Sequence, residues 1–313
     1  MNRLISLIKI SMLLLLSYFI FKDIEFDKLI LILNNYSVVG IVLIMSIILV
    51  GDYFYALRWY YLSDKKCSIL ASFESTILST LLNLILPAKL GEISRVIYLK
   101  KLYNYYINNS VSLLIIEKFF DLLFLAIFSF ISAVYILENN MVTNAAYLLV
   151  LICIILITAL KSKYTLFILK KIPFKLFRVY SIKIYKFIYN SFNINKLLII
   201  ILISMTTWFI YYLTSYILFI YIAEFDLTIF QTFIVFVISV IAFSLPITPG
   251  AVGIYEGSII MSLGWYGIDK ESALMAAIAL RFFHLFLMLL LSILILWNKK
   301  ISFKKLSGFV NAS

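Results

Sequence analysis

The sequence is poor in the residues that build catalytic and metal centres. It contains one histidine, His284, and two cysteines, Cys67 and Cys153, in 313 residues. No Ser-His-Asp triad, zinc spacing, Walker loop or dinucleotide fingerprint is present, so we expect no catalytic residue, no metal and no cofactor. We expect no disulfide either, because Cys67 is predicted to be cytosolic and Cys153 to lie within a membrane span.

Charge is also scarce. Charged residues make up 13% of the chain and apolar residues 64%, with a mean hydropathy of +1.08. Soluble globular chains are about 45–50% apolar, so this composition excludes a soluble protein and predicts an all-α polytopic membrane protein. The net charge of +12 lies in loops between apolar segments. That positive-inside distribution argues against nucleic acid as a partner and favours a multi-pass plasma-membrane protein.

The long apolar segments predict about six full spans, at residues 4–21, 38–57, 111–137, 145–160, 197–222 and 272–297. The loops at 22–36 and 224–226 are rich in acids and are expected outside. The segment 161–196 is rich in lysine and is expected on the cytoplasmic leaflet as a helix pair. With these assignments both termini are cytoplasmic.

Two further segments are interrupted by proline and glycine. If residues 69–86 crossed the membrane, every later basic loop would lie outside, against the charge rule. We therefore predict a re-entrant hairpin over 69–103 that bends near Pro87. Residues 251–265 are too short to cross, so we predict a second hairpin over 229–265 that bends at residues 246–257. The first hairpin opens from the cytoplasm and the second from outside.

These two hairpins divide a single membrane domain into two related parts. The first half covers residues 1–137, the basic segment 161–196 follows, the second half covers 197–298, and a short tail covers 299–313. Each half has a broken hairpin followed by a span with charges near its start. That arrangement predicts an inverted repeat with a site near the bilayer midplane.

Charged residues at that depth are costly, which marks them as candidates for an interior site. The candidate headgroup-binding residues are Lys89, Glu92, Arg95, Glu117, Asp121, Thr248, Gly250, Glu256 and Arg281. The candidate backbone-shaping residues are Asn83, Pro87, Gly91, Pro246, Pro249, Gly253 and Gly257.

Several of these assignments have an open alternative. Glu117 and Asp121 either bind a ligand or pair with Lys118 or Arg95. Lys89 and Arg95 either hold a phosphate or act as topological charges. A half-helix after Gly250 points its N–H groups at an anion. Arg281 either clamps that anion or neutralises Glu256.

The segments Leu86–Arg95 and Pro246–Gly257, with Glu117, Asp121 and Arg281, resemble the flippase-like membrane domain of the lysylphosphatidylglycerol synthases. Arg58-Trp59 also fits this resemblance, although both are ordinary interfacial anchors elsewhere. Lys89 and Lys118 stand where the family usually has arginine, which keeps the charge but loses bidentate geometry. In the full-length synthases this domain moves an aminoacylated phospholipid between leaflets, and a separate soluble domain attaches the lysine. We expect the present protein to be the membrane domain without that soluble domain.

The resemblance implies a lipid translocase for an anionic or aminoacylated phospholipid or a polyprenyl-phosphate lipid. Lys89, Arg95 and Arg281 would hold the phosphate. A secondary transporter of a small soluble anion uses the same architecture and is the first alternative. A non-transporting partner of a membrane glycosyltransferase or synthase is the second. Homo-oligomerisation or a membrane enzyme partner is compatible with each.

Overall fold

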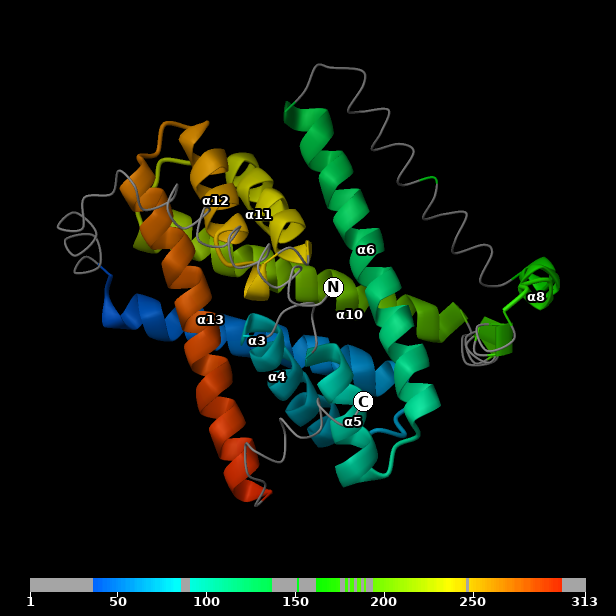
Figure 1. Ribbon diagram of the computed structural model, residues 1–313. Helices are drawn as coiled ribbons and strands as arrows, with labels where there is room; N and C mark the ends of the chain where they lie inside the picture. The colour runs from blue at the N-terminus through cyan, green and yellow to red at the C-terminus, as the bar shows by residue number, and fades with distance from the viewer. Residues whose placement is uncertain are drawn as a thin grey trace, which may run out of the picture. The chain divides into compact units, whose positions relative to one another are not determined.

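The structure is a computed structural model of the chain, and its helices follow the predicted segments closely (Figure 1). The residues that it describes contain helices and no strands. They are 36–85, 91–136, 151, 162–174, 178–179, 181–182, 185–186, 189, 194–245 and 248–299. The predicted span at 4–21, nearly all of the span at 145–160 and the tail after 299 lie outside these residues.

The first run of helices begins at the second predicted span. It consists of α3 (Val38–Leu62), α4 (Ile69–Ile85), α5 (Gly91–Tyr103) and α6 (Ile107–Ile136). A left-handed turn at Asp64 and Lys65, with φ of 56° and 61°, follows α3. Lys196 donates to the Leu62 carbonyl at 3.0 Å and pairs with Asp64 at 2.6 Å, which satisfies this helix end.

The second run repeats the pattern. It consists of α10 (Ile194–Ile217), continued by the π-helical turn η2 (Leu218–Ile222), then α11 (Ile229–Ser244), the 3-10 turn η3 (Pro249–Ala251), α12 (Ile254–Gly264) and α13 (Lys270–Asn298). Thr228 and Gln231 form a reciprocal capping box that starts α11. In the sequence, the short helix α8 (Lys163–Lys170) comes between the two runs, within the predicted basic segment.

The helix lengths correspond between the two runs. Helices α3 to α6 have 25, 17, 13 and 30 residues, and α10 to α13 have 24, 16, 11 and 29. The interrupted pairs α4–α5 and α11–α12 fall where the hairpins were predicted, at 69–103 and 229–265. In both runs the short pair is followed by a long helix.

Three helices of the described part are long and apolar enough to cross a membrane. They are Val38–Leu62, Asn195–Ile222 and Lys270–Asn298, which match the predicted spans at 38–57, 197–222 and 272–297. A bilayer core about 30 Å thick requires about 20 apolar residues in helical form, and all three exceed that length. The chain is therefore a membrane protein with several apolar helices.

The chain divides into two compact units. The first unit comprises Met1–Tyr53, Glu74–Arg95 and Thr207–Ser313, and the second comprises Phe54–Phe73 and Val96–Thr206. Helices α3, α4, α5 and α10 each contribute residues to both units.

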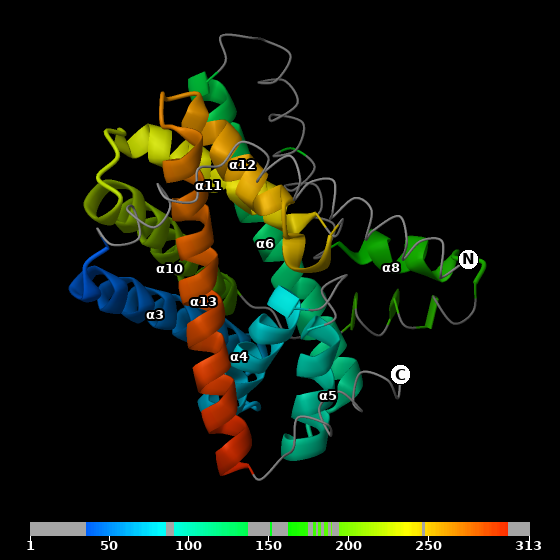
Figure 2. The same ribbon diagram turned by 60° about the vertical axis from the view of Figure 1, so that its left-hand side comes forward.

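In the first unit α12 packs against α11 and α13, as both views show (Figures 1 and 2). A run of buried alanines on α13, including Ala273, Ala276 and Ala277, provides the small side chains that close helix packing in membranes uses. Phe243 on α11 meets Tyr255 on α12 edge-on, with ring centroids 6.0 Å apart. These contacts hold α11 and α12 together, with α12 packed against α13.

The second unit has an apolar core of its own. It consists of Trp59, Leu62, Cys67, Ala71, Leu99, Tyr105, Leu113, Ile116, Phe120 and Ile200. The core draws side chains from α3, α4, α5, α6 and α10, and so fixes the rotation of α6 about its axis. That rotation decides where the charged side chains of α6 point.

Candidate functional site

The two helix breaks meet inside the first unit. Gly250 has a φ of +57°, and a Cβ at this position would overlap the backbone oxygen of Leu84, at the end of α4. Glycine is therefore required at Gly250 both for its left-handed conformation and for the close approach. Thr248 lies beside it, buried, and donates to the Val252 carbonyl at 2.8 Å.

A close approach also shapes the first break. A Cβ on Gly91, the first residue of α5, would overlap the backbone oxygen of Ser79 and the side chain of Asn83 on α4. The Asn83 amide in turn donates to Glu92 at 3.2 Å. The start of α5 is thus held directly against α4. The predicted site residues Pro87 and Lys89 lie outside the described residues, as does Pro246.

Arg281 fastens the second break to α13. Its Nε lies 2.7 Å from Oε1 of Glu256, and its Nη1 and Nη2 donate to the carbonyls of Gly250 and Ala251 at 2.9 and 3.3 Å. The guanidinium also lies over the Tyr255 ring, 5.0 Å from its centroid. Arg281 therefore satisfies backbone groups that the interruption leaves without helical partners.

The two carboxylate oxygens of Glu256 contact different groups. Its Oε2 accepts a hydrogen bond from the backbone N–H of Gly253 at 2.7 Å, while Oε1 pairs with Arg281. Gly253 precedes α12 with a φ of 84°, which is again a left-handed position suited to glycine. The carboxylate at the N-terminus of α12 in this structure is the chain's own, in the place where the sequence predicts an anion.

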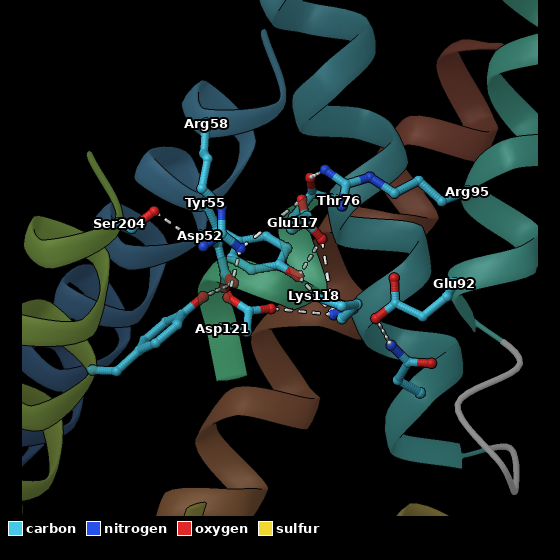
Figure 3. Close-up of polar contacts among 12 residues, drawn as sticks. Asp52, Tyr55, Arg58, Thr76, Glu92, Arg95, Glu117, Lys118, Asp121 and Ser204 are labelled. Carbon is cyan, nitrogen blue, oxygen red and sulfur yellow. Dashed lines mark hydrogen bonds and ion pairs between the residues drawn. The ribbon is translucent and has the colours of Figure 1, made fainter. Parts of the chain in front are cut away.

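Arg95 is the buried cation of the first break. Its side chain is 1% exposed, and its Nη2 donates to Thr76 Oγ1 on α4 at 2.8 Å (Figure 3). Glu92 is half-buried one turn before it on α5. These two residues and the Arg281–Glu256 pair place both signs of charge within the first unit.

A second charged cluster lies in the second unit and is centred on Arg58 of α3. This side chain is fully buried, and its Nη2 lies 2.8 Å from Asp121 Oδ1 and 4.0 Å from Glu117 Oε2. Its Nη1 donates to Ser204 at 3.3 Å, as Figure 3 shows. Glu117 and Asp121 lie one turn apart on α6, so one helix face supplies both acids.

Lys118 and Tyr55 complete this cluster. Tyr55 donates to Glu117 Oε1 at 2.6 Å, and Lys118 Nζ lies 3.1 Å from the Tyr55 hydroxyl and 3.4 Å from Asp121 (Figure 3). Two cations and two anions balance one another, which lowers the cost of burying each. Exposure rises from zero at Glu117 to 21% at Asp121 and 36% at Lys118. Asp121 and Lys118 are therefore the partly exposed members of the cluster.

The sequence interpretation of Arg58 and Trp59 as interfacial anchors is corrected by the structure, in which both side chains are 0% exposed. The sequence pattern, an arginine and a tryptophan at the end of an apolar segment, is the same whether these side chains contact lipid headgroups or the protein interior. For Glu117 and Asp121 the structure shows one of the pairings that the sequence left open, because Lys118 Nζ lies 3.8 Å from Glu117 Oε1 and 3.4 Å from Asp121 Oδ2.

Sequence reasoning also overlooked Asp52. This acid lies within the predicted span 38–57 and is 1% exposed. An acid inside an apolar segment is itself a signal of a functional position, and it could have been found from the sequence. Its partners are Tyr211, whose hydroxyl donates to Oδ1 at 3.1 Å, and His284, whose Nε2 lies 3.5 Å from Oδ2.

The predicted site residues thus fall into two groups. Glu92, Arg95, Thr248, Gly250, Glu256 and Arg281 belong to the first unit, and Glu117 and Asp121 belong to the second. Gly257 has open space around it and makes no close approach. Within the described residues no group of three histidine, cysteine or acidic side chains is arranged to hold a metal ion.

The chain is similar to a membrane protein over about two thirds of its length and matches a family model over nearly all of it. A UPF0104 membrane protein of Methanocaldococcus jannaschii is 29% identical over 214 residues, which cover 66% of this chain and 88% of that protein. The family model described as the lysylphosphatidylglycerol synthase TM region matches residues 5–292. Both charged clusters and both helix breaks lie within that match, and the chain belongs to the family of lysylphosphatidylglycerol synthase transmembrane regions.

Proposed function

We propose that this protein is a plasma-membrane lipid translocase. Its cargo would be an anionic or aminoacylated phospholipid, or a polyprenyl-phosphate lipid, whose headgroup crosses along polar side chains while the acyl or prenyl chains stay in the bilayer. The observation that carries the proposal is the meeting of two interrupted helices, Leu84 of α4 against Gly250, with buried charges at each break. Interrupted helices of this kind are tolerated at membrane depth where they line a site.

We further infer that the two runs form an inverted repeat. The matching helix lengths support a duplicated architecture, and the charge of the loops supports opposite orientations of the two hairpins. About six full spans, two re-entrant hairpins and cytoplasmic termini follow from this assignment. An inverted repeat brings corresponding breaks together at the midplane, as transporters with broken helices do.

The headgroup would be held by residues of both signs. In the first unit Arg95 and Arg281, with Lys89, would contact phosphate, and Glu92 and Glu256 would position these cations or contact a cationic headgroup. In the second unit Glu117 would contact a cationic headgroup. Nη1 and Nη2 of Arg281 each donate one N–H to a carbonyl, while Nε lies 2.7 Å from Glu256. One N–H on each terminal nitrogen is therefore left for a phosphate oxygen. A bidentate contact of this kind is the geometry that arginine offers and lysine does not.

Reconstitution tests the proposal directly. The purified full chain is incorporated into phosphatidylcholine vesicles with a trace of fluorescent phosphatidylglycerol, or of a fluorescent polyprenyl phosphate, and a membrane-impermeant quencher reports the outer leaflet. We expect quenching beyond half of the probe, which requires transfer from the inner leaflet. Transfer no faster than in empty vesicles for every headgroup would contradict the proposal.

Matched variants locate the pathway. Glu117→Ala and Arg281→Ala are each expected to lower transfer while the protein still inserts. Leu122→Ile on α6 and Phe282→Leu on α13 change exposed neighbours on the same helices and should transfer at the wild-type rate. Wild-type transfer by both charge variants would remove these residues from the mechanism. Uptake of labelled inorganic phosphate without lipid transfer would instead identify a transporter of soluble anions.

A further inference from the structure

Three polar side chains lie near the middle of the three described helices that are both long and apolar enough to cross the membrane. Asp52 is on α3, Tyr211 is on α10 and His284 is at the centre of α13, and all three residues belong to the first unit. None of them belongs to the charged pairs described at the helix breaks. An acid and a histidine at this depth are typical of proton relays in membrane transporters.

The local packing is built around Asp52. Its side chain is 1% exposed, and the Tyr211 hydroxyl donates to its Oδ1 at 3.1 Å. Gly51 makes this contact possible, because a Cβ there would lie 2.8 Å from the Tyr211 ring. Glycine at position 51 therefore lets the aromatic ring lie against α3, with its hydroxyl at the carboxylate.

The other carboxylate oxygen faces the only histidine of the chain. Asp52 Oδ2 and His284 Nε2 are 3.5 Å apart, and neither atom has a hydrogen-bond partner among the described residues. Both atoms are acceptors when the imidazole carries its proton on Nδ1, so they then repel each other. The neutral tautomer with its proton on Nε2 donates to Asp52 but leaves the carboxylate charge uncompensated. A second ring proton makes the imidazole a cation that donates the same hydrogen bond and neutralises the pair. The geometry is that of a site for one proton.

The neighbouring charged groups in this unit are engaged elsewhere. Arg281, one turn before His284 on α13, pairs with Glu256 of α12. Glu74 of α4 pairs with Lys299 at the end of α13, at 3.3 Å. The one titratable side chain of η2, that of Tyr221, is exposed. Among the described residues, His284 is therefore the basic side chain that neutralises Asp52, and the charge of the pair depends on the protonation of the imidazole.

We propose that Asp52 and His284 form a proton-binding site that couples lipid movement to the proton gradient. This inference rests on the translocase function proposed above. With the proton bound, the pair is neutral and holds α3 to α13. When the proton leaves, an unpaired carboxylate is left at membrane depth, which favours a conformation in which water reaches Asp52. Because α13 also carries Arg281, its displacement acts directly on the carbonyls of Gly250 and Ala251.

Proton binding is measured without any transport. The wild-type protein, labelled with nitrogen-15 histidine and placed in lipid nanodiscs, has a single imidazole to observe, because the chain contains one histidine. We expect its nitrogen-15 chemical shifts to show that the imidazole binds a proton when the solution is acidified. In Asp52→Asn the imidazole loses its counter-charge, and its nitrogen-15 spectrum should differ from that of the wild type at the same pH. Asp226→Asn, an exposed acid in a loop, is the control and should match the wild type.

Coupling is measured in the reconstituted vesicles, with fluorescent phosphatidylglycerol and an imposed pH gradient. We expect the wild-type transfer rate to differ about fivefold or more between the two gradient directions. Asp52→Asn and His284→Gln should transfer lipid at one rate in both directions. Ser46→Ala on α3 and Phe282→Leu on α13 should keep the wild-type response.

The outcomes separate the two proposals. Wild-type transfer that ignores the pH gradient, or follows a sodium gradient instead, overturns the coupling and leaves the translocase function standing. An imidazole signal that does not move with pH overturns the proton site. If no lipid moves in any vesicle, the translocase function fails and the coupling fails with it, while the titration still reports whether the pair binds a proton.

Discussion

The buried charge of Arg58 depends on neighbouring acids for its compensation. This arginine is fully buried, and Asp121 at 2.8 Å and Glu117 at 4.0 Å supply its counter-charge. Replacing such a cluster as a whole is often tolerated, but removing one partner leaves an uncompensated buried charge. Glu117 and Asp121 on α6 are therefore needed to compensate the charge of Arg58 on α3.

This dependence predicts the behaviour of Asp121→Asn. The substitution leaves Arg58 with its distant contact to Glu117, and the free energy of unfolding should fall by about 3–5 kcal/mol. The double variant Arg58→Met/Asp121→Asn, which removes both charges, should recover part of that loss. The stability of the detergent-solubilised protein, followed by titration with a denaturing detergent, measures both.

Asp64→Asn is the matched control for that experiment. Asp64 also pairs closely with a cation, Lys196, at 2.6 Å, but its side chain is 43% exposed. An exposed pair of this kind contributes less than about 1 kcal/mol, and Lys196 keeps its bond to the Leu62 carbonyl. Equal losses for Asp64→Asn and Asp121→Asn would contradict the importance given to burial.

At the scale of the elements, the interrupted pairs depend on two glycines that permit close approach. Gly91 lets α5 begin against α4, and Gly250 lets the second break reach the end of α4. Prolines interrupt the helices, but these glycines decide how near the resulting ends come to one another. The breaks are thus stabilised by backbone packing as well as by the Arg281 contacts.

Two of the glycines at the second break, Gly250 and Gly257, should respond oppositely to alanine. Gly250→Ala combines a left-handed φ of 57° with an overlap at Leu84, and should cost more than about 1 kcal/mol. Gly257→Ala lies within α12 with open space around it, and should raise stability by up to about 1 kcal/mol. Thermal unfolding of both variants in detergent measures the two changes in stability. If both variants were destabilised, or both stabilised, the different roles given to the two glycines would be contradicted.

The start of α13 gives a prediction that depends on pH. Burial opposes ionisation of the Asp269 cap, but hydrogen bonds from Ser272 outweigh it and hold the pKa of Asp269 below its ordinary value of 3.8. A depressed pKa means that the stabilisation is present above pH 3.8 and is lost as the pH falls through the folded value. Asp269→Ala should therefore cost about 1 kcal/mol at neutral pH.

That cost should shrink at acid pH. Below the folded pKa the wild-type carboxyl is protonated and accepts the Ser272 N–H more weakly, so wild type and Asp269→Ala should converge in thermal unfolding temperature. Asp226→Asn provides the comparison, because this exposed loop acid caps no described helix. A difference between wild type and Asp269→Ala that stays constant down to pH 3 would argue against the cap.

At the scale of the whole molecule, the hairpin assignment has a consequence for membrane sidedness. A re-entrant α4–α5 pair returns the chain to the side from which it entered, whereas a crossing reverses it. Lys66 precedes this pair and Lys100 lies near its end, and both side chains are exposed. Asp226 lies in the loop between η2 and α11, and the charge of the loops predicts that this loop lies outside.

Cysteine labelling tests that sidedness. In a background of Cys67→Ala and Cys153→Ala, the single variants Lys66→Cys, Lys100→Cys and Asp226→Cys are treated with a membrane-impermeant maleimide on intact cells. We expect labelling of Asp226→Cys alone, and labelling of the other two only after the membrane is permeabilised. Opposite accessibility of Lys66→Cys and Lys100→Cys would show that the segment crosses and that every later loop is inverted.

Most helix bounds could be predicted from the sequence because they depend on local properties. The length of an apolar run against the thickness of a bilayer predicts a long helix such as α13, and proline with glycine predicts a break such as the one at Gly250. The candidate residues at the breaks, Glu256 and Arg281 among them, were also recognisable, since a charge inside an apolar segment is rare and costly.

The pairing of these charges could be decided only by the tertiary structure. Arg58 and Asp121 are far apart in the sequence, as are Asp52 and His284, and each pair forms because two helices present particular faces to each other. In a soluble protein an apolar stripe reveals that face. Membrane helices such as α3 and α10 are apolar on all sides, so the sequence determines where they begin and end, and packing alone determines which way their few charged side chains point.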